Sequence, residues 1–155
     1  MGVDLGRKVK VGAVIRLRTC KGVAFAQVSH KNDQFGHLLR IFDGFDDLEP
    51  WWSTEHQKTV QFSAFFPLQA AVNLELVEFV CTASVPERLA VFPMFRARAG
   101  GPGGSVWLWD GAVESRLGRA LTADEQKYPV RSIVSAPVLI DRVETGYRSE
   151  IDERW

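Results

Sequence analysis

The side chains best suited to acid–base, nucleophilic or metal chemistry are three histidines and two cysteines, namely His30, His37, His56, Cys20 and Cys81. Imidazole is the usual side chain for proton transfer near neutral pH and for binding zinc. The histidines form no H-x-x-x-H or H-E-x-x-H pattern, the cysteines form no C-x-x-C pair, and no G-x-S-x-G sequence is present. We therefore expect no catalytic residue, no metal site and no cofactor. A hydrolase that uses His37 or His56 is kept as a minor alternative.

A glycine-rich segment over residues 99–105 is the next candidate for chemistry, because backbone amides in such loops can hold phosphate. The segment does not match G-x-x-x-x-G-K-[ST], Pro102 removes a donor, and a predicted strand follows where a helix would be needed. We interpret it as a flexible surface loop.

The strongest candidate for a binding surface is the acidic and aromatic segment over residues 42–52. Adjacent tryptophans in this segment cannot both point inward from regular structure, and clustered carboxylates beside aromatic anchors suit the capture of a basic protein. The alternative is that one tryptophan closes the end of a barrel while the acids remain solvated. The predicted partner-binding residues are Asp43, Asp46, Asp47, Glu49, Trp51 and Trp52.

Charge as a whole gives no argument for nucleic acid, because 19 basic residues balance 19 acidic ones in a chain of 155. The basic residues are nevertheless concentrated between Arg7 and Lys21. This strand face supports an alternative function, a small nucleic-acid-binding or regulatory module, although Arg16 and Arg18 with few exposed aromatics nearby are more typical of a solvated strand face.

These side chains must be positioned by a chain that is rich in predicted strands. Apolar residues alternate over 9–17, the turn 20–22 follows, and further strands are expected over 23–28 and 37–42. Residues 44–55 are expected to form an irregular loop. Three strands with short connections suggest a meander or a small barrel.

Later elements carry clearer local signals. Asp110-Gly111 predicts a hairpin over 106–119, Thr122-Ala-Asp-Glu125 fits a capping box, and Ser135-Ala-Pro137 fits a helix N-terminus. Trp107 and Trp109 are expected in a central, covered strand. The remaining segments are a strand or buried helix end over 58–66, a strand over 74–82 and an extended connection over 84–93.

Together these elements predict a β-rich fold, between all-β and α+β, with a strongly bent antiparallel sheet or small barrel and two or three short helices. We expect a single domain over residues 1–155. The apolar region 62–80 is interrupted by Gln69, Asn73, Glu75 and Glu78 and cannot span a bilayer. No signal peptide is apparent, so the expected location is the cytoplasm, with both cysteines reduced and mostly buried.

Several segments, in order, resemble the bacterial family called immunity protein 26, whose members are partners of polymorphic toxins. The resemblance covers about residues 8–146 and includes V-G-A-V-I-R-L-R-T-C-K-G-V-A-F-A-Q-V near the start, L-L-R-I-F-D at 38–43 and W-L-W-D-G at 107–111. It also includes F-P-M-F-R at 92–96, L-T-A-D-E at 121–125 and A-P-V-L-I-D-R-V at 136–143. The resemblance implies a non-enzymatic cytoplasmic protein that binds and neutralises a cognate toxin domain. The resemblance supplies no catalytic residues. Separately, an exposed Trp51-Trp52 pair would allow a homodimer.

Overall fold

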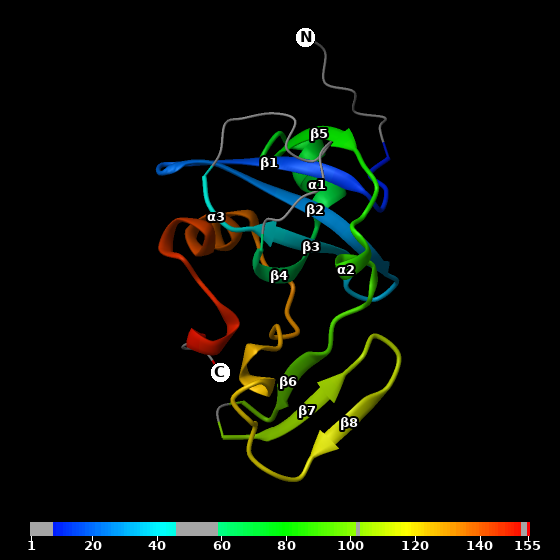
Figure 1. Cartoon of the computed structure of the whole chain (residues 1–155), viewed down its shortest axis with the longest axis vertical. Helices are drawn as coiled ribbons and strands as arrows, with labels where there is room; N and C mark the ends of the chain where they lie inside the picture. Colours follow the sequence, from blue (N-terminus) through cyan, green and yellow to red (C-terminus); the bar gives the residue numbers. More distant parts are fainter. Residues whose placement is uncertain (1–7, 46–58, 102, 153–154) are drawn as a thin grey trace.

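The chain forms two antiparallel sheets, one above the other in Figure 1, in a computed structural model that describes residues 8–45, 59–101, 103–152 and 155. The larger sheet has the order β4-β3-β2-β1-β5 and the smaller has the order β6-β7-β8. The strands are β1 (Ala13–Thr19), β2 (Gly22–Asn32), β3 (Gly36–Phe42), β4 (Val60–Phe66), β5 (Glu78–Thr82), β6 (Phe95–Ala99), β7 (Ser105–Trp109) and β8 (Glu114–Leu117). The helices are α1 (Leu68–Asn73), α2 (Glu87–Ala90) and α3 (Ala136–Thr145), with short 3₁₀ turns η2 (Glu125–Lys127) and η3 (Ser149–Ile151).

The β-rich class is therefore confirmed, with short helices around an antiparallel sheet. Register shifts interrupt three of the four pairings in the larger sheet, and such bulges bend and twist strands. Within the described residues, β4 and β5 are the sheet's edges and do not pair with each other, so the sheet is open and is not the closed barrel of the alternative prediction.

The first strand begins later than its hydrophobic alternation predicts. Ala13, Ile15 and Leu17 are fully buried as expected, but Val11 is 47% exposed. The chain turns before the strand at Gly12, whose φ is +96°, and a side chain there would lie 2.6 Å from the carbonyl oxygen of Ala83. The prediction of a strand from residue 9 is thus wrong at its start, because a tertiary contact overrides the local pattern.

The structure also shows the secondary structure of three other predicted segments. Residues 60–66 form strand β4, which decides between the strand and helix alternatives. The predicted strand over 74–82 begins only at Glu78, because Leu74 caps α1 and Glu75 adopts a φ of 59°. The predicted extended connection over 84–93 contains the short helix α2, whose Leu89 is buried.

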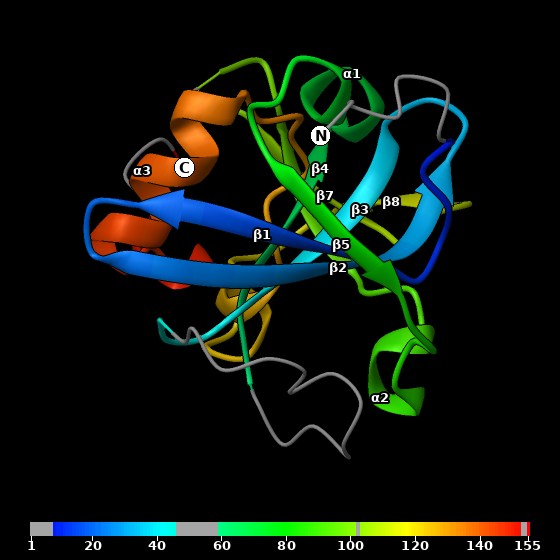
Figure 2. The ribbon, with the colours of Figure 1, turned by 90° about the horizontal axis from the view of Figure 1, so that it is seen from above.

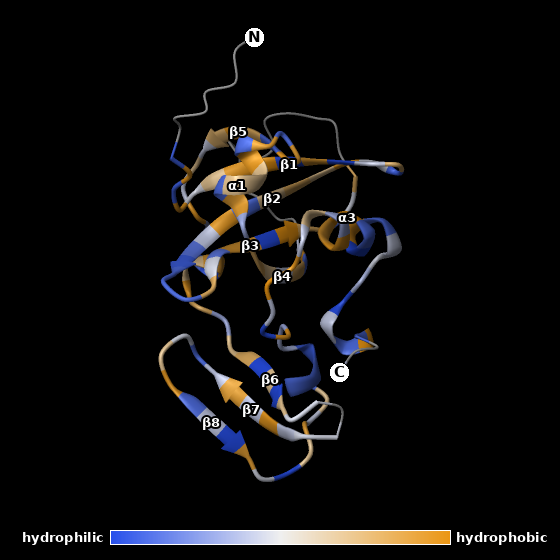
Figure 3. Ribbon diagram, turned by 180° about the vertical axis from the view of Figure 1, so that it is seen from behind, coloured by the Kyte–Doolittle hydropathy of each residue, from blue (hydrophilic) through white to orange (hydrophobic). Residues whose placement is uncertain are grey.

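The larger sheet is covered by helices on both faces. α1 and α3 lie on one side of β1 and β2, and α2 lies on the other, as Figure 2 shows. Leu68 and Ala71 of α1 and Leu139 and Val143 of α3 pack against the apolar side chains of the first face. Figure 3 shows the contrast between mostly apolar β1 and mostly polar β8, which is largely exposed.

The two sheets are joined by an aromatic cluster and by a strap, which we define as residues 129–134. Phe65 of β4, Phe95 of β6 and Trp109 of β7 are buried together with Leu38. The strap hydrogen-bonds to both sheets: Val134 N–H donates to the Phe65 carbonyl at 3.0 Å, and Arg131 N–H donates to the Arg96 carbonyl at 2.9 Å. As expected, Trp109 lies in a central strand and is covered.

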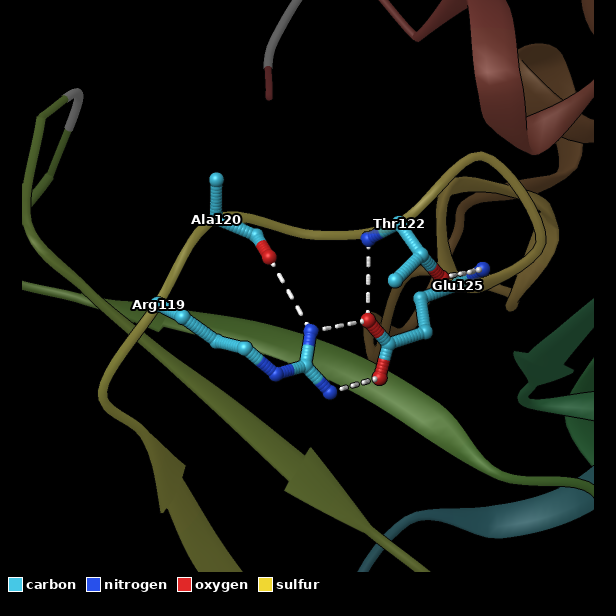
Figure 4. A network of polar contacts seen from close by, with 4 residues as sticks. All are labelled: Arg119, Ala120, Thr122 and Glu125. Carbon is cyan, nitrogen blue, oxygen red and sulfur yellow. Dashed lines mark hydrogen bonds and ion pairs between the residues drawn. The ribbon is translucent and has the colours of Figure 1, made fainter.

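The local signals of the last third are confirmed. β7 and β8 flank Asp110-Gly111, where the Asp110 carboxylate accepts from the amides of Ala112 and Val113. The reciprocal capping bonds between Thr122 and Glu125 are present, although a 3₁₀ turn follows instead of an α-helix (Figure 4).

Helix α3 begins and ends at the residues that its sequence indicates. Ser135 is its N-cap, and Gly146 ends it in the left-handed conformation. No helix in the described ranges is both long enough and apolar enough to cross a bilayer.

Candidate partner-binding site

Of the six predicted partner-binding residues, the structure describes Asp43. The other five, Asp46, Asp47, Glu49, Trp51 and Trp52, lie outside the described residues. Asp43 directly follows β3, at the point where the predicted binding segment leaves the sheet.

Asp43 makes three contacts with two residues of the described chain, Thr59 and Arg148. Its backbone N–H donates to the Thr59 carbonyl at 2.9 Å, its carboxylate accepts from the Thr59 hydroxyl, and Arg148 forms an ion pair with it at 2.7 Å. Thr59 directly precedes β4, so these contacts hold the chain at Asp43 and at Thr59 side by side, and the ion pair with Arg148 attaches Asp43 to the C-terminal segment.

A groove of about 310 Å³ lies beside Asp43. We call it the Asp43 groove; its lining residues are Lys21, Asp43, Gly44, Phe45, Gln61, Val143, Glu144, Thr145, Gly146 and Arg148. Its shape depends on the end of α3, because the Gln61 amide donates to the carbonyls of Arg142 and Tyr147, both at 3.1 Å. Phe45 is 42% exposed at its rim.

The charges around the Asp43 groove are mixed rather than uniformly acidic. Lys21 and Arg148 face Asp43 and Glu144, and the carboxylate of Glu144 also accepts from the backbone N–H of Cys20 at 3.0 Å. A partner here would meet an exposed aromatic ring between charges of both signs, which favours one register of docking over others.

The two histidines that the structure describes, His30 and His37, lie in strands β2 and β3, and the Nε2 atom of His37 is buried without a hydrogen-bond partner among the described residues. His30 is in β2 and not in a turn as expected; its ring nitrogens contact the Ser29 hydroxyl at 2.9 Å and the Ala90 carbonyl at 2.8 Å. Burial lowers the pKa of His30, and burial with the charge of Lys31 lowers the pKa of His37. His56 lies outside the described residues, so the hydrolase alternative remains a prediction.

The cysteines are free thiols, but their expected burial is wrong for Cys20. Cys20 is exposed in the tight turn between β1 and β2, whereas Cys81 is partly buried in β5. A hydrogen bond to Glu144 raises the pKa of the Cys20 thiol, and burial raises that of Cys81.

The basic strand face is partly neutralised within the chain. Arg16 and Arg18 both pair with the carboxylate of Glu78, at 2.8 and 3.2 Å. Sequence reasoning missed this because Glu78 becomes a neighbour only when β5 pairs with β1. The nucleic-acid alternative stays a prediction, and nothing in the geometry adds to it.

Sequence reasoning also missed the buried arginines. Arg40 of β3 donates to the Ser29 hydroxyl at 2.9 Å and the Val91 carbonyl at 3.2 Å, and burial, with the charge of Arg88, lowers its pKa to about 10. Arg96 of β6 is 2% exposed. The available signal was an arginine with apolar residues on both sides of it in a strand, since such side chains are buried only when they have partners.

Comparisons of the chain with protein-family models, with curated proteins and with solved structures found no match. A function for this chain is therefore inferred from its own residues and from the sequence resemblance described above.

Proposed function

We propose that this chain is a non-enzymatic immunity protein that binds and neutralises a cognate bacterial toxin domain. The proposal combines the resemblance to immunity protein 26 with the way in which residues 44–58 are attached to the fold. In this proposal the chain acts in the cytoplasm by recognising the surface of another polypeptide.

The observation that supports the proposal most directly is the anchoring at Asp43. A segment whose two ends are fixed at one place on a sheet presents its residues from that place, as recognition loops on rigid scaffolds do. The Asp43 groove and the exposed ring of Phe45 lie at the same place, so docking would extend from the groove onto the segment.

The chemistry of the segment indicates a basic partner. Residues 43–58 contain five carboxylates and one lysine, together with the Trp51-Trp52 pair. Acidic residues would accelerate the encounter with a basic toxin surface, and buried tryptophans would supply the affinity. Neutralisation would follow from occlusion of the toxin's working surface.

The test is co-expression with a cognate toxin domain, which the proposal expects to be encoded in the open reading frame immediately upstream of this gene. We expect the wild-type chain to restore growth and the Trp51→Ala/Trp52→Ala variant to lose the rescue, because the loss of two aromatic anchors costs at least about 4 kcal/mol of binding at a hot spot. Purified proteins should show the same difference in a titration.

Val113→Ala is the matched control, because Val113 is an exposed apolar residue in the turn between β7 and β8, 62% accessible. It should rescue like the wild type. Rescue that survives the double tryptophan change would refute the interface but not the immunity function, whereas failure of the wild-type chain to rescue would refute the function itself.

A further inference from the structure

A second cavity, of about 470 Å³, lies between the smaller sheet and the C-terminal segments, away from the Asp43 groove. We call it the arginine pocket. Its volume falls in the range of about 300–1,000 Å³ that is usual for small-molecule sites. The residues that line it are Arg96, Arg98, Val106, Ala120, Leu121, Gln126, Glu150, Asp152 and Trp155.

Two arginines and a tryptophan form one part of the arginine pocket. Arg96 and Arg98 alternate on β6 and so share one face of the smaller sheet. Their guanidinium carbons lie 4.3 and 4.5 Å from the centre of the Trp155 ring. Cation–π contacts of this kind hold the ring and both guanidinium groups in place.

A network of polar contacts fixes another part of the pocket, as Figure 4 shows. The Arg119 guanidinium binds both carboxylate oxygens of Glu125, at 2.6 and 3.0 Å, and also donates to the Ala120 carbonyl at 3.0 Å. The residues between these contacts include Ala120 and Leu121, and Gln126 follows directly. These contacts fix the backbone around Ala120 and Leu121.

The charged side chains of the pocket differ in how many polar contacts they make with the rest of the chain. Arg96 donates to the carbonyls of Tyr128 and Ser149, and Asp152 accepts from the Tyr147 hydroxyl at 2.6 Å and lies 3.9 Å from Arg142. Arg96 and Asp152 are therefore already engaged in contacts that stabilise the fold.

Arg98 and Glu150 make fewer polar contacts with the rest of the chain. The Arg98 guanidinium donates to the Gly104 carbonyl at 3.2 Å, while its Nε is buried with no partner in the described structure. Glu150 is exposed on η3. Within the described residues, neither side chain forms an ion pair, although Arg98 also contacts the Trp155 ring, so the pocket holds one cation and one anion without an ion-pair partner near the apolar side chains of Val106 and Leu121.

We propose that the arginine pocket binds a small zwitterion with an apolar body, the chemistry of a free aliphatic amino acid or a short aliphatic peptide. The ligand carboxylate would bind the Arg98 guanidinium, its ammonium group would bind Glu150, and its side chain would contact Val106 and Leu121. This site is independent of the proposed immunity function and of residues 44–58.

Calorimetric titration of the full chain tests the proposal with leucine, the dipeptide Leu-Leu, leucinamide and 4-methylpentanoate. Leucine or Leu-Leu should bind saturably. Comparison of their two affinities shows whether the pocket prefers a free amino acid or a short peptide. Leucinamide, which lacks the carboxylate, and 4-methylpentanoate, which lacks the ammonium group, should each bind at least about tenfold more weakly than leucine, because each loses one charge-assisted contact.

Variants assign each ligand charge to its residue. Arg98→Gln should weaken leucine at least about tenfold but leave leucinamide nearly unchanged, and Glu150→Gln should weaken leucine while leaving 4-methylpentanoate nearly unchanged. Arg98→Lys keeps the charge and should retain part of the affinity. If the better-binding zwitterion is Leu-Leu, the same comparisons are made with its amide and with its deaminated analogue.

Arg116→Gln and Glu87→Gln are the matched controls. Arg116 is opposite Trp107 and so lies on the other face of the smaller sheet, and Glu87 lies on α2. Both should bind like the wild type, and thermal unfolding should show that all variants are folded. The proposal is overturned if neither zwitterion binds at millimolar concentration, or if folded Arg98→Gln and Glu150→Gln bind as the wild type does.

Discussion

At the scale of single residues, this fold places several ionisable groups where the charged form is disfavoured. His30 and His37 are in strands of the larger sheet, and burial is the main reason that both have a lowered pKa. The unfolded chain then binds more protons than the folded chain as the pH falls through about 6.5, so the free energy of unfolding must decrease over that interval.

We accordingly expect the urea midpoint of the wild-type chain to fall between pH 7.5 and pH 5.5. His37→Gln should show a smaller fall, because a side chain that does not titrate replaces one of the two groups. Equilibrium unfolding at pH 7.5, 6.5 and 5.5 measures both, with the slope against urea concentration checked for constancy. A midpoint that rises as the solution is acidified would contradict the assignment of burial as the cause.

At the scale of elements, the backbone at Gly12 determines where the first strand begins. Gly12 has a positive φ, and its Cα approaches the Ala83 carbonyl so closely that a methyl group has no room. Gly146, at the end of α3, also has a positive φ but has open space around it. Comparing alanine substitutions at these two glycines therefore distinguishes the free-energy cost of the backbone conformation from the cost of a steric clash.

Gly12→Ala should therefore destabilise the protein more than Gly146→Ala, by about 1–3 kcal/mol, which is the usual cost of forcing extra volume into a packed site. Urea unfolding of the two variants, compared with the wild type, measures the difference. Equal losses in the two variants would mean that the chain around Ala83 moves aside without cost.

The elements that sequence reasoning predicted well are those determined by adjacent residues. The Asp110-Gly111 hairpin, the Thr122–Glu125 capping bonds and the Ser135 N-cap all depend on contacts within a few positions. The start of β1 could not be predicted in the same way, because it depends on Ala83.

The candidate site shows the same division. Its acidic and aromatic composition was visible in the sequence, but the partner of Asp43 is Arg148, 105 positions away. A pattern of residues reveals such a pair only when the sheet and α3 are already in place.

At the scale of the whole molecule, the two sheets share the aromatic cluster of Phe65, Phe95 and Trp109. Each ring packs against the others with centroids between 5.1 and 6.0 Å apart. Because this cluster belongs to both sheets, neither sheet can lose its packing there without exposing side chains of the other.

Phe95→Ala should consequently destabilise the whole protein by about 3–5 kcal/mol, the typical cost of removing a buried phenylalanine. In the wild type, unfolding followed by far-ultraviolet and near-ultraviolet circular dichroism should give coincident transitions. A near-ultraviolet transition that precedes the other would show that the smaller sheet separates first.

The strap and α3 follow the strands in the sequence, and this order matters during biosynthesis. The eight strands found in the described residues are complete by Leu117, yet the strap that joins the sheets and helix α3, which helps to cover the first face, come after it. A nascent chain therefore carries Ile15, Leu17 and Leu39 without Leu139 and Val143 against them until α3 has been added. During synthesis, protection of this unfinished surface from other chains must come from the ribosome or from chaperones.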